Sequence, residues 1–156
     1  MTKNLLVVLC AFCLAFGLSC NPKSSGSRTK KTETRFDFGR STTIESLRAT
    51  IANILRKYNH DLRGSDTFIE TEYRNITPVE SEEVQGIKEV RYKISVNMSA
   101  RRNISAAEAR LQCEGRYETG EWAKINPSTE LVEFVKNMQD EIKQELQRKY
   151  PKHEWQ

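Results

Sequence analysis

The sequence predicts an α+β domain, with a mainly antiparallel sheet covered on one face by two amphipathic helices in the order β-α-β-β-β-α. Two segments, 89–98 and 107–117, alternate polar and apolar residues, which is typical of strands with one buried face. Two others, 42–58 and 127–150, repeat apolar residues every three or four positions, as amphipathic helices do. An antiparallel sheet with one polar face needs cover on the other, so we expect a two-layer sandwich.

The first half of the domain is assigned from capping and periodicity. Residues 36–38 are expected to form a short strand, and Thr42 with Glu45 matches a capping box at the start of the first helix. Residues 67–73 read as a strand, followed by a loop at 75–86. The apolar helix face is expected to comprise Ile44, Leu47, Ile51, Ile54, Leu55 and Tyr58, and one face of the strand Ile69, Thr71 and Tyr73.

The second half is expected to be a hairpin followed by a helix. The two alternating segments are joined by a turn at 99–105 and should pair antiparallel. Asn126 is a suitable N-cap and Pro127 suits the first helical turn, while Pro151 ends the helix. Its apolar stripe is expected to comprise Leu131, Val135, Met138, Ile142, Leu146 and Tyr150.

The N-terminal region has the layout of a bacterial lipoprotein signal peptide. A start containing Lys3 is followed by an uncharged, largely apolar stretch at 5–18, then by Ser19, Cys20 and a polar run. This resembles lipoprotein signal peptides over roughly the first twenty-five residues. The resemblance implies removal of residues 1–19, a lipid on Cys20 and attachment of the remaining chain to a membrane.

Two alternatives remain open for this segment. An ordinary secretory signal would be cut near Ser19 and the chain would be released. An uncleaved anchor would have to cross the bilayer with a stretch of fourteen residues, which spans only about 21 Å as a helix against a hydrocarbon core of about 30 Å.

Positive charge is concentrated between Cys20 and the expected domain. Residues 20–35 carry a net charge of +4, whereas residues 36–156 carry −1. A polar segment of this kind buries too little to fold, so we expect a disordered tether with an average span of about 20 Å, which could also lie against anionic headgroups. A near-neutral domain does not fit a nucleic-acid-binding protein. The expected organisation is a signal peptide (1–19), a tether (20–35), one domain (36–150) and a C-terminal tail (151–156).

The expected architecture is similar to that of small envelope lipoproteins of Gram-negative bacteria. The shared features are a lipidated cysteine, a polar tether, a helix such as 42–58, and a run like that from Phe68 to Arg74 before a long alternating strand. Comparable proteins are the BamC component of the outer-membrane barrel-assembly machine and the LptE subunit of the lipopolysaccharide translocon. The resemblance implies the periplasmic face of the outer membrane and an envelope protein partner, and it transfers no binding residue.

Cysteine and histidine give no sign of a metal or catalytic site. Cys10 and Cys13 would leave with the signal peptide, so Cys113 is the remaining cysteine of the domain, and its place on an apolar strand face predicts a buried thiol. His60 and His153 lack zinc-ligand spacing and are expected to be exposed to solvent.

The acidic residues allow two weak alternatives. Glu80, Glu82 and Glu83 could bind calcium but lack the pattern of a calcium loop, so a solvated loop is expected. Glu70 and Glu72 share a strand face, as the paired carboxylates of glycosidases can, but any wet sheet face gives the same pattern. We therefore expect no catalytic residue, no cofactor and no metal.

Two arginines are candidate partner contacts, and two tryptophans have an open role. Arg101 and Arg102 lie at the centre of the expected turn and could meet an acidic partner or a lipid headgroup, although a solvated turn gives the same pattern. Trp122 and Trp155 lie outside the periodic segments, where each is either a core residue or an exposed anchor.

These observations favour a membrane-anchored, non-enzymatic envelope lipoprotein that binds protein partners or scaffolds an assembly. One alternative is a lipid- or lipopolysaccharide-binding module, which needs an apolar cavity between sheet and helices or a basic docking patch. The other is a hydrolytic enzyme, which needs a pocket that brings Glu70, Glu72 or His60 together with further polar groups. No nucleic-acid partner is expected.

Overall fold

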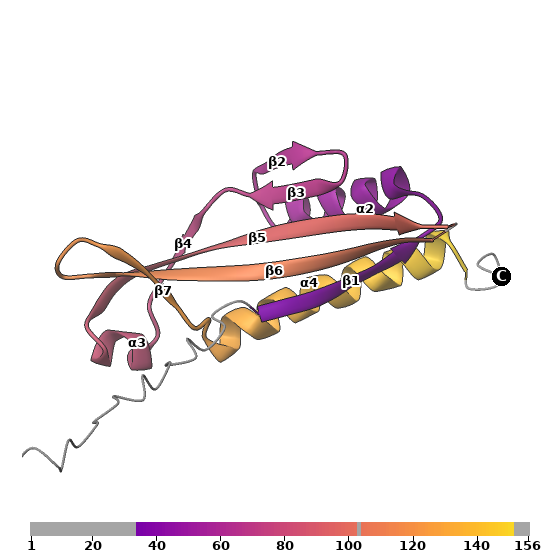
Figure 1. Ribbon diagram of the computed structural model, residues 1–156. Coiled ribbons are helices and arrows are strands. Elements are labelled where there is room, and N and C mark those ends of the chain that lie inside the picture. Colours follow the sequence, from indigo (N-terminus) through magenta and orange to yellow (C-terminus); the bar gives the residue numbers. More distant parts are fainter. Residues whose placement is uncertain (1–33, 103, 152–156) are drawn as a thin grey trace, which may run out of the picture.

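The computed structural model describes residues 34–102 and 104–151, and within them the chain forms three helices and one seven-stranded antiparallel sheet (Figure 1). The mixed helix and strand class and the antiparallel sheet are thereby confirmed. The strands are β1 (Thr34–Ser41), β2 (Leu62–Ser65), β3 (Phe68–Thr71), β4 (Arg74–Ile76), β5 (Ile87–Arg101), β6 (Ile104–Tyr117) and β7 (Trp122–Ile125). The helices are α2 (Ile44–Lys57), α3 (Glu80–Val84) and α4 (Thr129–Lys149).

The long hairpin of β5 and β6 forms the centre of the sheet. Its pairs run from Arg101 opposite Ile104 at the turn to Ile87 opposite Tyr117 at the other end. Near the turn the strand order is β1-β6-β5-β3-β2, whereas further along β7 pairs with β6 and β4 pairs with β5. The strands β2, β4 and β7 and the helix α3 were not predicted, because segments of three to five residues carry too little periodicity to stand out.

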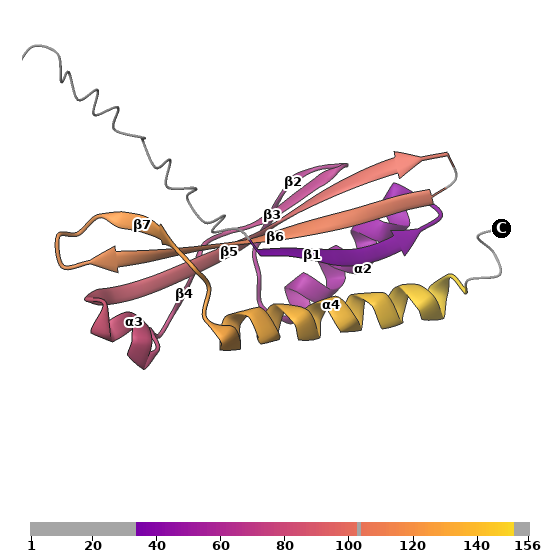
Figure 2. The same cartoon turned by 60° about the horizontal axis from the view of Figure 1, so that its bottom comes forward.

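One apolar core joins the sheet to the two longer helices. Figure 2 shows α2 and α4 on the same side of the strands. The predicted stripe of α4 is buried at Leu131, Val135, Met138, Ile142 and Leu146. The buried strand residues alternate along the hairpin, at Val90, Tyr92, Ile94, Val96 and Met98 on β5 and at Ala107, Ala109, Leu111 and Cys113 on β6.

Both predicted helix caps are wrong by one or two residues. The N-cap of α2 is Thr43, not Thr42, and its side-chain oxygen accepts a hydrogen bond from the backbone N–H of Ser46. The N-cap of α4 is Ser128, not Asn126, and its hydroxyl oxygen accepts from Leu131. Several suitable capping residues stand next to each other at both places. The residue that adopts extended φ and ψ just before the first turn becomes the cap.

The predicted strand at 67–73 is interrupted. β3 ends at Thr71 and β4 starts at Arg74, and the hydroxyl oxygen of the buried Thr71 accepts a hydrogen bond from the backbone N–H of Ile94. This bond to the Thr71 side chain takes the place of the backbone hydrogen bond that would continue the pairing of the two strands. Tyr73 therefore leaves the face of Ile69, so the prediction that Tyr73 shares that face is wrong.

His60 is buried, contrary to the expectation that it is exposed to solvent. Its exposed fraction is 4%, and its ring packs edge-on against Tyr92, with 5.7 Å between the ring centroids. The Nε2 atom lies 3.5 Å from the Tyr92 hydroxyl. The sequence showed a polar residue after a helix, but the chain turns inward there because Asn59 adopts a φ of 60°.

This burial predicts a pH-dependent stability near neutrality. Burial lowers the pKa of His60 below its ordinary value of 6.5, helped by the positive charge of Arg74 and opposed by Asp61. The unfolded chain then binds this proton more readily than the folded protein, so stability is present above about pH 6.5 and is lost as pH falls below it. We expect the free energy of unfolding in urea to fall between about pH 7 and pH 5. The variant His60→Gln should flatten this slope, and an unchanged slope would show that another group is responsible.

Candidate functional site

The side of the sheet opposite to α2 and α4 carries mostly polar side chains, and we call it the polar sheet face. It comprises the alternate residues of β5 from Glu89 to Ser99 and of β6 from Ala106 to Arg116, with neighbours on the flanking strands. Within residues 34–102 and 104–151, no helix lies on this side (Figure 2). The face is therefore a surface on which residues from distant parts of the chain meet.

The guanidinium of Arg91 lies between two aromatic rings, toward the end of this face where Ile87 pairs with Tyr117. Its Cζ atom is 4.2 Å from the ring centroid of Tyr73 and 3.9 Å from that of Trp122. Its Nε and Nη2 atoms donate to the same carboxylate oxygen of Glu114 at 2.9 and 2.7 Å. Stacking and hydrogen bonds together hold this side chain in one orientation. We call Tyr73, Arg91 and Trp122 the aromatic stack.

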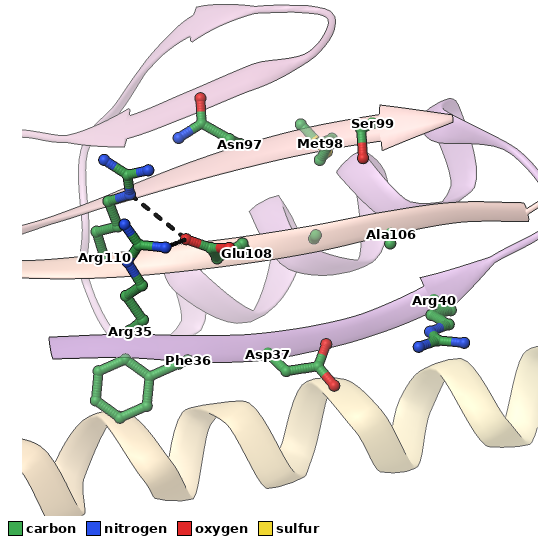
Figure 3. Close-up of a pocket in the computed structure, with 11 residues that line it drawn as sticks. Arg35, Phe36, Asp37, Arg40, Asn97, Met98, Ser99, Ala106, Glu108 and Arg110 are labelled. Atoms are coloured by element: carbon green, nitrogen blue, oxygen red, sulfur yellow. Dashed lines mark ion pairs between the residues drawn. The ribbon is translucent and has the colours of Figure 1, made fainter. Parts of the chain in front are cut away.

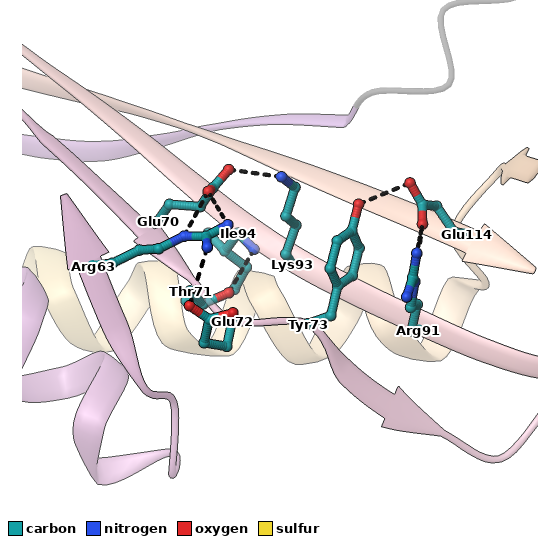
Figure 4. A network of polar contacts seen from close by, with 9 residues as sticks. All are labelled: Arg63, Glu70, Thr71, Glu72, Tyr73, Arg91, Lys93, Ile94 and Glu114. Atoms are coloured by element: carbon teal, nitrogen blue, oxygen red, sulfur yellow. Dashed lines mark hydrogen bonds and ion pairs between the residues drawn. The ribbon is translucent and has the colours of Figure 1, made fainter. Parts of the chain in front are cut away.

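Glu114 joins two members of the aromatic stack, Tyr73 and Arg91. It accepts a 2.8 Å hydrogen bond from the Tyr73 hydroxyl on its second oxygen, as Figure 4 shows. Burial acts against ionisation, but the hydrogen bonds from Tyr73 and Arg91 outweigh it and hold the pKa of Glu114 below its usual range. Burial, followed by the bond to Glu114, raises the pKa of Tyr73 to about 12. Glu114 is therefore an ionised acceptor and Tyr73 a neutral donor around neutral pH.

Trp122 begins β7 and is half-buried. The neighbouring Arg116 also lies over its ring, at 5.6 Å from the centroid, and forms an ion pair with Glu89. The sequence left open whether Trp122 is a core residue or an exposed anchor, and the structure places it on the polar sheet face.

Glu70 and Glu72 are both held by Arg63 from β2. Glu70 accepts from Arg63 and from Lys93, each at 2.7 Å, and Glu72 lies 3.3 Å from Arg63. The hydrogen bond from Lys93, supported by that from Arg63 and opposed by burial, lowers the pKa of Glu70. Glu70 is therefore not held protonated near neutral pH, as a general acid requires.

The hydrolytic alternative therefore gains no support from these residues. His60 is buried among core residues rather than beside Glu70 and Glu72. Glu82, expected in a solvated loop, is 7% exposed, and its carboxylate accepts from the N–H of Val79 at the start of α3. Within the described part of the chain, no group of three or more metal-ligating side chains is found.

A shallow cleft of about 770 Å³ hollows the polar sheet face near the β5–β6 turn. Figure 3 shows Arg35 and Arg110 pointing toward Glu108, at 3.3 and 3.5 Å from its Oε1 atom. The other polar residues that line it are Asp37, Arg40, Asn97 and Ser99.

The two arginines singled out from the sequence lie at the same end of the domain as this cleft. Arg101 is the last residue of β5, opposite Ile104, and Arg102 follows in the turn with a φ of 56°. Both are exposed. The structure does not bring them together with the aromatic stack, which lies further along the hairpin.

Cys113 is buried and free, as expected, and burial, above all, raises the pKa of its thiol to about 12. The predicted lipidation site Cys20, residues 20–33 of the expected tether, and the residues His153 and Trp155 lie outside the described residues. The last two residues of the expected tether, Thr34 and Arg35, belong instead to β1, because β1 pairs with β6 as far as Leu111.

No protein-family model matches this chain, and no curated protein matches it. Among the helices of the described residues, none has both the length and the apolarity needed to cross a membrane.

The aromatic stack was missed by the sequence analysis. Arg91 and Glu114 could have been paired from the alternation of the two long strands, which places both on the polar side. Tyr73 and Trp122 could not, because Tyr73 changes face at an unpredicted break and Trp122 belongs to an unpredicted strand.

Proposed function

We propose that this chain is a membrane-anchored, non-enzymatic envelope lipoprotein, whose domain is a two-layer sandwich that binds a protein partner through its polar sheet face. The observation that carries the binding part is the aromatic stack, on a face that none of the helices in the described part of the chain covers. Tyr, Trp and Arg are the residues most enriched at the energetic centres of protein interfaces. Here all three are fixed by contacts within the domain.

Preorganisation supports this role. A side chain that is already ordered loses little conformational freedom on binding, so more of its contact energy appears as affinity. The charges around the stack are paired within the domain, at Glu114 with Arg91 and at Glu70 with Lys93. A partner would therefore gain most from covering the exposed part of Trp122, with the paired charges forming a polar rim.

The lipid-binding alternative lacks a cavity in the described residues but has a candidate basic patch. The sheet and helices enclose a continuous apolar core, and the cleft described above lies on the polar sheet face, which does not suit a buried lipid. The alternative to a cavity was a basic docking patch, and the arginines that line the cleft, Arg35, Arg40 and Arg110, are candidates for it.

Membrane attachment is tested by changing the proposed lipidation site. The variant Cys20→Ser should move the protein from the membrane pellet to the soluble fraction in cells, because the acyl chains that would hold it are lost. Metabolic labelling with a fatty acid should mark the wild-type protein only. Retention of Cys20→Ser in a carbonate-washed pellet would contradict the lipoprotein assignment.

Partner binding is tested by Trp122→Ala in the anchored protein. After chemical crosslinking in native membranes, we expect wild type to recover a defined envelope protein in stoichiometric amount, and Trp122→Ala to recover at least tenfold less, as for a residue at the centre of an interface. Phe68→Ala is the matched control, since Phe68 is a half-buried aromatic residue on the polar sheet face beside Asn97. Equal recovery by all three proteins would exclude the aromatic stack as the contact.

A further inference from the structure

Positive charge is unevenly distributed along the polar sheet face. Around the aromatic stack, four cations form ion pairs with four acids: Arg63, Arg91, Lys93 and Arg116 with Glu70, Glu72, Glu89 and Glu114. Lys124 of β7, opposite Glu114, is a fifth cation there, so these residues carry an excess of one positive charge. Between the β5–β6 turn and the cross-strand pair of Arg35 with Arg110 lie five arginines, which we call the arginine end: Arg35, Arg40, Arg101, Arg102 and Arg110. The acids that line the cleft there are Asp37 and Glu108, so the arginine end carries an excess of positive charge.

Three of these arginines are available to a ligand. Arg40, Arg101 and Arg102 are exposed, and none of them makes an ion pair within the described part of the chain. Arg40 lies opposite Ala106 on β6, and Ala106 lies opposite Ser99, two residues before Arg101. The register therefore places these guanidinium groups around one end of the sheet.

The acids at this end do not cancel the excess. Asp37 lies 3.7 Å from Lys143 of α4 and accepts a hydrogen bond from the N–H of Gly39. Glu108 lies within ion-pair distance of both Arg35 and Arg110. Each acid is already engaged by cations or by backbone.

The chemistry of the arginine end suits phosphate. The guanidinium group presents a planar fork of donors that matches phosphate oxygens and remains charged at all relevant pH values. The amide of Asn97 and the hydroxyl of Ser99 line the same cleft as Arg40 and can donate further hydrogen bonds.

The length of chain before β1 permits contact with the membrane at the same time as lipid attachment. Residues 21–33 separate Cys20 from Thr34, and thirteen residues reach at most about 45 Å when extended. From Thr34, next to Arg35 of the arginine end, β1 runs over about 24 Å and finishes at Ser41, which lies opposite Ser105 near the β5–β6 turn. The end of the sheet lies within reach of a bilayer that holds Cys20.

We propose that the arginine end docks on the anionic phosphate headgroups of a membrane surface. The inference that this is the same membrane that holds the lipid on Cys20 rests on the proposed function. Docking would orient the domain. Glu89, which pairs with Arg116 beside Trp122, lies twelve residues before Arg101 on β5, a distance of about 40 Å along a strand. With the strands upright on the bilayer, the aromatic stack would then be held away from the membrane surface, where a partner can reach it.

The test is sedimentation with lipid vesicles. It uses the chain from residue 20 with Cys20→Ser, so that no acyl chain attached to the protein contributes to binding. Vesicles of phosphatidylcholine with phosphatidylglycerol should bind it, and vesicles of phosphatidylcholine alone should not. The triple variant Arg40→Gln, Arg101→Gln, Arg102→Gln should lower the partition coefficient roughly a hundredfold, at about fivefold for each cation near an anionic surface. All three side chains are exposed, so folding should be retained, as far-UV circular dichroism can verify.

A matched variant separates a local site from net charge. Arg56→Gln, Lys88→Gln and Lys136→Gln change the charge by the same amount at exposed positions away from the arginine end and should lower partitioning only a few-fold. Equal loss in both variants, or equal binding to both kinds of vesicle, would overturn the proposal. Displacement by millimolar inorganic phosphate at constant ionic strength would also overturn it, in favour of a small-anion site. Because the protein used here carries no acyl chain, failure of this test leaves the Cys20 experiment unaffected.

Discussion

Phe38→Ala is expected to lower the free energy of unfolding by about 3–5 kcal/mol, which is the usual loss for a buried phenylalanine. Phe38 lies on β1 with 0% of its surface exposed and belongs to the core that includes residues of both α2 and α4. Removing the ring loses its burial and leaves a cavity between strand and helices. Because domains of this size are stable by about 5–15 kcal/mol, much of the folded population could be lost at 37 °C.

Chemical denaturation followed by circular dichroism measures this effect. Phe38→Leu should recover most of the stability, because an apolar side chain of similar reach refills the site. Phe68→Ala removes the same ring from a half-buried position on the polar sheet face and should have a clearly smaller effect. Equal losses at positions 38 and 68 would contradict the assignment of Phe38 to the core.

Glu114→Ala is expected to be the most destabilising change on the polar sheet face, at about 2–3 kcal/mol, since hydrogen bonds to charged groups contribute more than neutral ones. The carboxylate is 17% exposed and Arg91 is 27% exposed, so both are largely shielded from water. The substitution leaves Arg91 and the Tyr73 hydroxyl without their shared acceptor. We expect Trp122 fluorescence to change as well, because Arg91 lies over its ring.

Glu108→Ala is the matched control on the same strand and face. Glu108 is 49% exposed and meets Arg35 at 3.3 Å, and exposed ion pairs contribute about 0–1 kcal/mol. The contribution of Glu114 should also depend on pH. Since its folded pKa is lowered, this stability is present above its unfolded pKa near 4.5 and is lost as pH falls through the folded value. Similar losses for both variants would show that the network around Glu114 is no more than surface pairing.

The candidate surfaces were only partly predictable. Alternation placed Arg91 and Glu114 on the polar side of the long hairpin, because side chains in a strand point to opposite faces in turn. Arg101 was expected in a turn at 99–105, whereas β5 continues to Arg101. The arginine end could not be foreseen as a unit, since Arg35 and Arg40 approach Arg110 and Arg101 only through the pairing of β1 with β6. That pairing joins residues far apart in the chain, which local patterns do not record.

The sequence by itself determined the long-range periodic features of this protein: the two central strands, the buried stripe of α4 and the burial of Cys113. Each follows from repeating apolar positions, whose burial is the main driving force of folding. Tertiary structure alone decided the caps at Thr43 and Ser128, the break after Thr71 and the burial of His60. At these places local chemistry allows several near-equal choices, and packing against distant residues selects one of them.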